Sequence, residues 1–204
     1  DYKLEWLQRI SQTCDINSVK NLSTNSQWQQ DDRYINLHHA LDLVQINGDY
    51  LEFGVFTGGA LVFATKVNKK MSWINQNKTR FFGFDSFEGF GNLDSSDQHP
   101  FYKDSIFRVN FTKVKKNILN QTKKDVVHLI KGYFNETLDG HCPDEYGIKK
   151  AKIIFIDCDL KNPAKSALNF CKNLIQEGTI IILDDYFSYK GNSNLGISGR
   201  SEEH

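Results

Sequence analysis

The sequence of 204 residues lacks several features that would assign it at once to a broad class of protein. Lys and Arg together number 25, as do Asp and Glu, so the net charge is zero and no strongly basic face for nucleic acid is indicated. No apolar run approaches the roughly 20 residues of a membrane span, and the N-terminal segment has no long apolar stretch like that of a signal peptide. We therefore expect a protein that binds neither nucleic acid nor a membrane.

Paired cysteines and clustered histidines are also missing. The four cysteines form no C-x-x-C pair, which is typical of reduced, intracellular proteins and predicts a cytoplasmic location. The six histidines show no metal-ligand spacing, and His128 falls inside an apolar run, where we expect a buried core histidine. Carboxylates are then the remaining candidates for a metal site.

What the sequence does contain is a series of short apolar runs that alternate with segments of helical periodicity. We expect strands at 50–55, 80–85, 125–130, 152–157 and 178–185, with helices at 60–75, 112–122 and 163–175. Near-continuous apolar strands alternating with helices are typical of a parallel sheet covered on both faces. The sequence therefore predicts a doubly wound, Rossmann-like α/β fold.

Two further helical segments, 2–10 and 31–46, precede the first strand. We assign residues 1–47 to an N-terminal helical extension and residues 48–204 to the α/β domain. An apolar stripe from Ile35 to Ile46 predicts that the extension forms a homodimer or larger assembly, or else a cap over the site.

A glycine-containing loop follows the first expected strand, and ligands of open parallel sheets bind at the carboxyl ends of strands. The glycines let the backbone turn tightly and approach a ligand closely. Phe56 replaces the middle glycine of a dinucleotide fingerprint and would obstruct a pyrophosphate, whereas S-adenosylmethionine (SAM) has no phosphate. The loop thus favours SAM, and a strand–helix turn with incidental glycines is the alternative. The candidate cofactor-binding residues here are Glu52, Gly54, Thr57, Gly58 and Gly59.

Acidic residues follow the other expected strands. Asp85 ends the second strand, where an acid can accept hydrogen bonds from ribose hydroxyls or, alternatively, cap a helix. Asp157 and Asp159 follow the fourth strand, and Asp184 and Asp185 the fifth. Converging carboxylates disfavour ionisation unless a cation compensates, and oxygen ligands select a hard cation such as Mg²⁺. A magnesium site is therefore predicted, the alternative being one nucleotide-orienting and one helix-capping aspartate.

Read together, these motifs resemble the SAM-dependent O-methyltransferases of the macrocin, mycinamicin and novobiocin-sugar type. The resembling segments span residues 31–187 and read YLEFGVFTGGA, FFGFDSFEGF, LIKGYFNETL, IIFIDCDL and GTIIILDDYF. The DSFEG motif and the pairing of DxDL with DDY are the specific part. The resemblance implies a class I methyltransferase fold, SAM as methyl donor, assistance by Mg²⁺, and a hydroxyl acceptor on a sugar or small glycosylated metabolite.

The resemblance also implies roles for individual residues. It places Asp85 and Ser86 beside the ribose of SAM. It makes Asp159 a catalytic base, with Asp157 both catalytic and metal-binding. The segment bordering the adenine comprises Gly132, Tyr133 and Phe134, and the magnesium ligands comprise Asp157, Asp184 and Asp185.

Two departures from the family pattern concern the acceptor. The family often continues D-L-Y-x-S after the fourth strand, whereas this chain continues through residues 160–163 as Leu-Lys-Asn-Pro, which leaves the acceptor open. Family members also continue past the fifth strand with a helix and a strand hairpin, so either the C-terminal part of the fold is missing from this sequence or the chain is a minimal form of the fold. Two alternatives remain: a nucleotide-sugar glycosyltransferase with Asp157 and Asp159 as its D-x-D motif, or a catalytically inactive methyltransferase fold that serves as a binding module.

Overall fold

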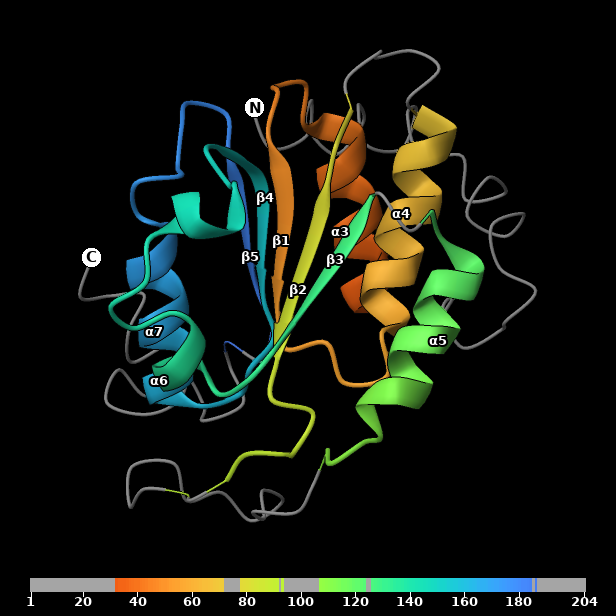
Figure 1. Ribbon diagram of the computed structural model, residues 1–204. Coiled ribbons are helices and arrows are strands. Elements are labelled where there is room, and N and C mark those ends of the chain that lie inside the picture. Colours follow the sequence, from red (N-terminus) through yellow and green to blue (C-terminus); the bar gives the residue numbers. More distant parts are fainter. Residues whose placement is uncertain are drawn as a thin grey trace.

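All five expected strands form, and they pair in parallel within one sheet of order β3-β2-β1-β4-β5 (Figure 1). The computed structural model describes residues 32–71, 78–91, 93, 107–123, 126–184 and 186, so the expected helix at 2–10 and the side chain of Asp185 lie outside it. The strands are β1 (Asp49–Phe53), β2 (Phe81–Asp85), β3 (Val127–Lys131), β4 (Ala151–Ile156) and β5 (Ile180–Leu183). Because β1 lies between β2 and β4, the strand order reverses at β1, and this is where such sheets bind ligands.

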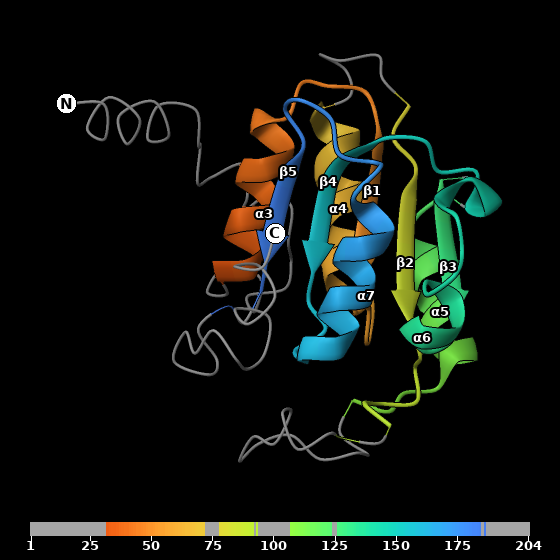
Figure 2. The same cartoon turned by 90° about the vertical axis from the view of Figure 1, so that its left-hand side faces the viewer.

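Helices cover both faces of the sheet, which confirms the doubly wound fold (Figures 1 and 2). One face carries α3 (Asp32–Leu43), α4 (Gly59–Met71) and α5 (Phe111–Gln121). The opposite face carries α6 (Phe134–Thr137) and α7 (Lys161–Cys171), and a short 3₁₀ helix spans Pro143–Tyr146. No helix of the described segments is long and apolar enough to span a bilayer.

The strands form because most side chains of β1 and β4 are apolar and both faces of the sheet are covered. Successive residues point to opposite faces, so Tyr50 packs in the core under α3, α4 and α5, while Leu51 packs in the core under α6 and α7. Phe53 stacks on Phe84 of the neighbouring strand with ring centroids 5.0 Å apart. These packed strands hold their carboxyl ends in fixed relative positions.

The helix α3 belongs to this same core. Its apolar stripe is buried within the chain, through Leu37, Ala40, Leu41 and Val44, and the helix packs against α4 and β5. Much of the stripe on which we based an assembly or a cap therefore packs inside the fold. The homodimer stays a prediction that must rest on other surfaces.

The expectation that His128 is a core histidine is wrong. In the described sheet β3 is an edge strand, and the His128 side chain is exposed and stacks on Phe82 with ring centroids 4.8 Å apart. An apolar run does not reveal whether its strand is central or at an edge, because both can carry the same residue types.

Candidate cofactor and acceptor site

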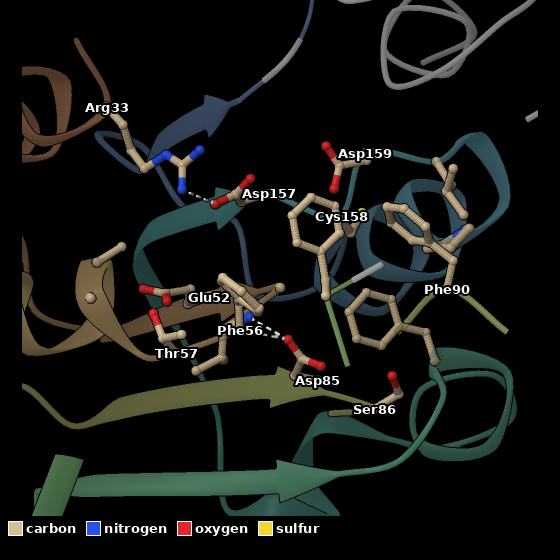
Figure 3. Close-up of a pocket in the computed structure, with 18 of the residues that line it drawn as sticks. Arg33, Glu52, Phe56, Thr57, Asp85, Ser86, Phe90, Asp157, Cys158 and Asp159 are labelled. Carbon is tan, nitrogen blue, oxygen red and sulfur yellow. Dashed lines mark hydrogen bonds and ion pairs between the residues drawn. The ribbon is translucent and has the colours of Figure 1, made fainter. Parts of the chain in front are cut away.

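A single cavity lies at the carboxyl ends of β1, β2 and β4, and it brings together most of the expected site residues (Figure 3). Of the residues expected from the sequence, it is lined by Glu52, Gly54, Thr57, Gly59, Asp85, Ser86, Tyr133, Phe134, Asp157 and Asp159. Gly58 and Gly132 lie in the adjoining loops without lining the cavity. Asp184 does not line it either, but it forms an ion pair with Arg33, which does. Asp185 lies outside the described residues.

The glycine loop runs tightly against the end of β4. Gly54 has a φ of 98°, and a Cβ placed on it would lie 1.8 Å from the backbone oxygen of Asp157. Gly58 has a φ of 84°, and its N–H donates to the carbonyl of Val55 at 2.8 Å. Glycine is needed at both positions because other residues rarely adopt these dihedrals. The expected tight turn is confirmed.

Asp85 holds this loop in place from the neighbouring strand. Its Oδ2 accepts hydrogen bonds from the backbone N–H groups of Val55 at 2.7 Å and Phe56 at 2.8 Å, and its Oδ1 accepts one from Phe87 at 2.6 Å. A carboxylate has about four acceptor positions, so one remains for a ribose hydroxyl. The structure thus gives Asp85 a role in shaping the loop, and its contact with ribose stays a prediction.

Glu52, near the end of β1, is a fully buried carboxyl of which only one oxygen accepts a hydrogen bond. The Tyr50 hydroxyl donates to its Oε2 at 2.7 Å, whereas its Oε1 has no hydrogen-bond partner among the described residues. Burial raises the pKa of Glu52 to about 8, against the opposing effects of the Tyr50 hydrogen bond and the Arg33 charge. A buried oxygen without a partner in a cavity wall is suited to a cationic ligand group.

The acidic residues that follow β4 and β5 are joined by an arginine that the sequence reading missed. One guanidinium nitrogen of Arg33 lies 3.0 Å from Oδ2 of Asp157 (Figure 3). Another lies 2.8 Å from Oδ2 of Asp184. Burial raises the pKa of Asp157; Asp184 and Asp159 add to this effect, and Arg33 opposes it. Of the four carboxylates expected to converge at adjacent strand ends, the structure brings Asp157 and Asp184 together on one arginine.

The expected magnesium site is not seen among the described residues. Within the described segments, no three His, Cys, Asp or Glu residues are arranged to hold a metal ion. The oxygens of Asp157 and Asp184 are suitable ligands for a hard cation, but in this arrangement they pair with Arg33 instead. Asp159 lines the cavity with a left-handed backbone φ of 61°, a conformation that aspartate tolerates better than most residues.

Aromatic side chains that the sequence reading did not single out form another part of the cavity wall. Phe107 packs edge-on against both Phe56 and Phe90, with centroids 5.3 Å apart in each pair. Phe56 and Phe107 are exposed and have positive φ values of 49° and 66°. Such backbone strain in a bulky residue often marks a ligand site. In the sequence, only Phe56 within the glycine loop indicated that aromatic side chains would line the cavity.

Comparisons with known proteins agree with this geometry. The family model described as macrocin-O-methyltransferase (TylF) matches residues 29–197. The solved structure of CalS11, a calicheamicin methyltransferase, is similar with a TM-score of 0.65 and 19% identity over 89% of this chain and 76% of that one. The O-methyltransferase NovP is similar with a TM-score of 0.57 and 21% identity over 75% of this chain and 64% of its own. No curated protein sequence matches the chain.

The two structural similarities, each below 25% identity, establish the fold, and the family model establishes the family. That assignment decides against the glycosyltransferase alternative. The chain belongs to the macrocin O-methyltransferase family, and it is an O-methyltransferase with the Rossmann-like methyltransferase fold.

Proposed function

We propose that this chain transfers the methyl group of SAM to a hydroxyl on a sugar or small glycosylated metabolite. The observation that carries the proposal is that one cavity is lined both by Glu52, whose buried Oε1 could accept a hydrogen bond from a cationic group, and by Asp157 and Asp159 at the end of β4. Two names support a sugar acceptor. The family is named after the O-methylation of macrocin, and CalS11 is described as a TDP-rhamnose 3′-O-methyltransferase.

The cofactor would lie with its methionine end at the glycine loop and its adenine near Tyr133 and Phe134. Glu52 supports the first placement, because its buried Oε1 is a good acceptor for the ammonium group of SAM. Asp85 and Ser86 line the cavity between these two ends, where ribose hydroxyls would be. When bound, SAM supplies the methyl group on a sulfonium centre.

The residues of β4 and β5 would act on the acceptor. Alignment of the hydroxyl with the methyl group is the main physical contribution of such a site. Asp159, which lines the cavity, would accept the hydroxyl proton as the methyl group is transferred. Asp157, Asp184 and Asp185 would hold Mg²⁺, whose charge makes an acceptor hydroxyl more acidic.

The setting of the reaction is part of the same proposal. Cys158 and Cys171 are buried and unpaired, as expected for the reducing cytoplasm in which we place the enzyme. The acceptor would be a small molecule, with neither nucleic acid nor a membrane as partner. A homodimer is retained as a proposal to be tested by sedimentation.

Calorimetric titration with SAM and its demethylated product tests the cofactor assignment, with UDP plus Mn²⁺ as the competing ligand. We expect SAM binding and no UDP binding. Release of the demethylated product in the presence of TDP-rhamnose then tests turnover. Binding without turnover over a panel of nucleotide sugars and glycosides would favour the inactive binding module, and absence of SAM binding would refute the proposed function.

A further inference from the structure

The first turn of α3 carries a cation where helix electrostatics disfavours one. Arg33 is the second residue of the helix Asp32–Leu43, and the N-terminal end of a helix carries a partial positive charge. An arginine at this position is opposed by the helix dipole unless anions lie nearby. The two carboxylates of Asp157 and Asp184 supply those anions, from the ends of two other elements.

The geometry of the contact is that of one guanidinium shared between two carboxylates. Separate nitrogens of Arg33 reach Oδ2 of Asp157 at 3.0 Å and Oδ2 of Asp184 at 2.8 Å. The three side chains are 34%, 13% and 21% exposed, so the ion pairs are partly shielded from water. Shielding strengthens charge interactions relative to a surface ion pair.

A divalent cation and this guanidinium need the same oxygens. The backbone fixes where the carboxylates start, because the N–H of Asp157 donates to Phe53 and the N–H of Asp184 donates to Ile156. Two like charges cannot both occupy the space between these acids without strong repulsion. Cation binding must therefore be linked to a movement of Arg33.

We propose that Arg33 is a positioning residue that competes with divalent cations for Asp157 and Asp184, and so sets the cation affinity of the site. In the cation-free protein it compensates the charge of both acids and holds them together. The inference deepens the proposed function, since it concerns the same acidic site, but it is a statement about cation binding and needs neither SAM nor an acceptor. It also makes the position of α3 sensitive to occupancy of that site.

The test is Mn²⁺ binding to the full chain without SAM, measured by electron paramagnetic resonance of the free ion and by calorimetry. We expect Arg33→Met to bind Mn²⁺ about tenfold tighter than the unaltered protein or more, because one competing charge is removed. Arg33→Lys should bind with intermediate affinity, since one ammonium cannot span both acids as a fork does. Adding Asp184→Asn to Arg33→Met should abolish the gain.

Arg80→Met is the matched control. Arg80 is also a partly exposed arginine, 41% exposed, and pairs with Asp49 at 2.6 Å, but at the opposite end of β1 and outside the cavity. Its substitution should lower thermal stability and leave Mn²⁺ affinity unchanged. In Arg33→Met, Mn²⁺ should also raise the melting temperature more than it does in the unaltered protein.

The remaining outcomes each support or overturn the proposal. Equal Mn²⁺ affinity in Arg33→Met and the unaltered protein would show that the guanidinium and the cation do not compete, and weaker binding would show that Arg33 supports the cation. If Arg33→Met folds only with Mn²⁺, the proposal stands; if Mn²⁺ does not restore folding and Arg33→Lys has unchanged affinity, it falls. A parallel SAM titration separates these results from failure of the proposed function.

Discussion

Glu52→Gln should change the pH dependence of stability, because it removes a buried carboxyl from the cavity wall. The Glu52 side chain is fully buried, and burial raises its pKa from an ordinary value of 4.5 to about 8. Between these two values the unfolded chain has released the proton that the folded chain still holds. The folded state therefore binds more protons, and stability falls as pH rises through this window.

The size of the effect follows from the rise in pKa. With about 1.36 kcal/mol for each pH unit, ionised Glu52 costs about 5 kcal/mol of folding free energy well above its folded pKa of about 8. The cost is absent below 4.5, where the carboxyl is protonated in both states. From about pH 5 to about pH 7.5, the unaltered protein should lose about 3 kcal/mol relative to Glu52→Gln.

Urea denaturation at several pH values measures this difference. Glutamine has its own cost for a buried amide, so the change with pH, rather than the offset at one pH, is the diagnostic quantity. Tyr50→Phe provides a second variant, because it removes the hydrogen bond that lowers the pKa of Glu52 and should extend the loss of stability to higher pH. A free-energy difference between Glu52→Gln and the unaltered protein that stays constant from pH 5 to 7.5 would refute the reasoning.

Binding of SAM should change the ionisation of the Glu52 carboxyl. If the ammonium of SAM pairs with Glu52, binding favours the ionised form and must release a proton near neutral pH. Calorimetry in two buffers of different ionisation enthalpy measures that proton, and Glu52→Gln should lose both the proton release and part of the affinity. Proton-free SAM binding would place the ammonium elsewhere.

Three further predictions concern the rest of the cavity. Asp85→Asn should weaken SAM binding by about 1–3 kcal/mol in calorimetry, because an amide cannot accept all the hydrogen bonds of the carboxylate; unchanged affinity would exclude a ribose contact. Gly54→Ala should destabilise the fold by at least about 3 kcal/mol in denaturation experiments, since its Cβ would overlap the backbone oxygen of Asp157. Asp184→Asn should reduce turnover far more than SAM affinity, and full activity of this variant in EDTA would remove the metal from the mechanism.

The fold could be read from the sequence because its strands are apolar and its connections carry clear turn residues. Runs such as residues 151–156 are apolar enough to predict strands, and this strand is buried along its whole length. The edge position of His128 and the short helix Phe134–Thr137 were not foreseen, since neither has a periodicity of its own. The packing of α3 against α4 and β5 was not foreseen, because an apolar stripe looks the same whether it packs within a chain or between chains.

The sequence could predict which site residues lie close together only where those residues follow neighbouring strands. Asp157 and Asp184 follow neighbouring strands, so their convergence follows from topology. Arg33 lies more than a hundred residues away in the sequence, and no local pattern connects it to them. The same holds for Phe107, which meets Phe56 only because the chain returns to the cavity after β2.

The two ends of the cavity are mechanically joined through the backbone. Gly54 lies in the expected cofactor loop, directly after β1. Its backbone runs so close to the carbonyl of Asp157 that no side chain would fit there. Asp85 fixes the same loop from the other side through Val55 and Phe56. A shift of the loop that accompanies cofactor binding must therefore press on the strand end that bears the acidic pair. Because Arg33 links that pair to α3, SAM binding and cation binding should influence each other even where the two ligands do not touch.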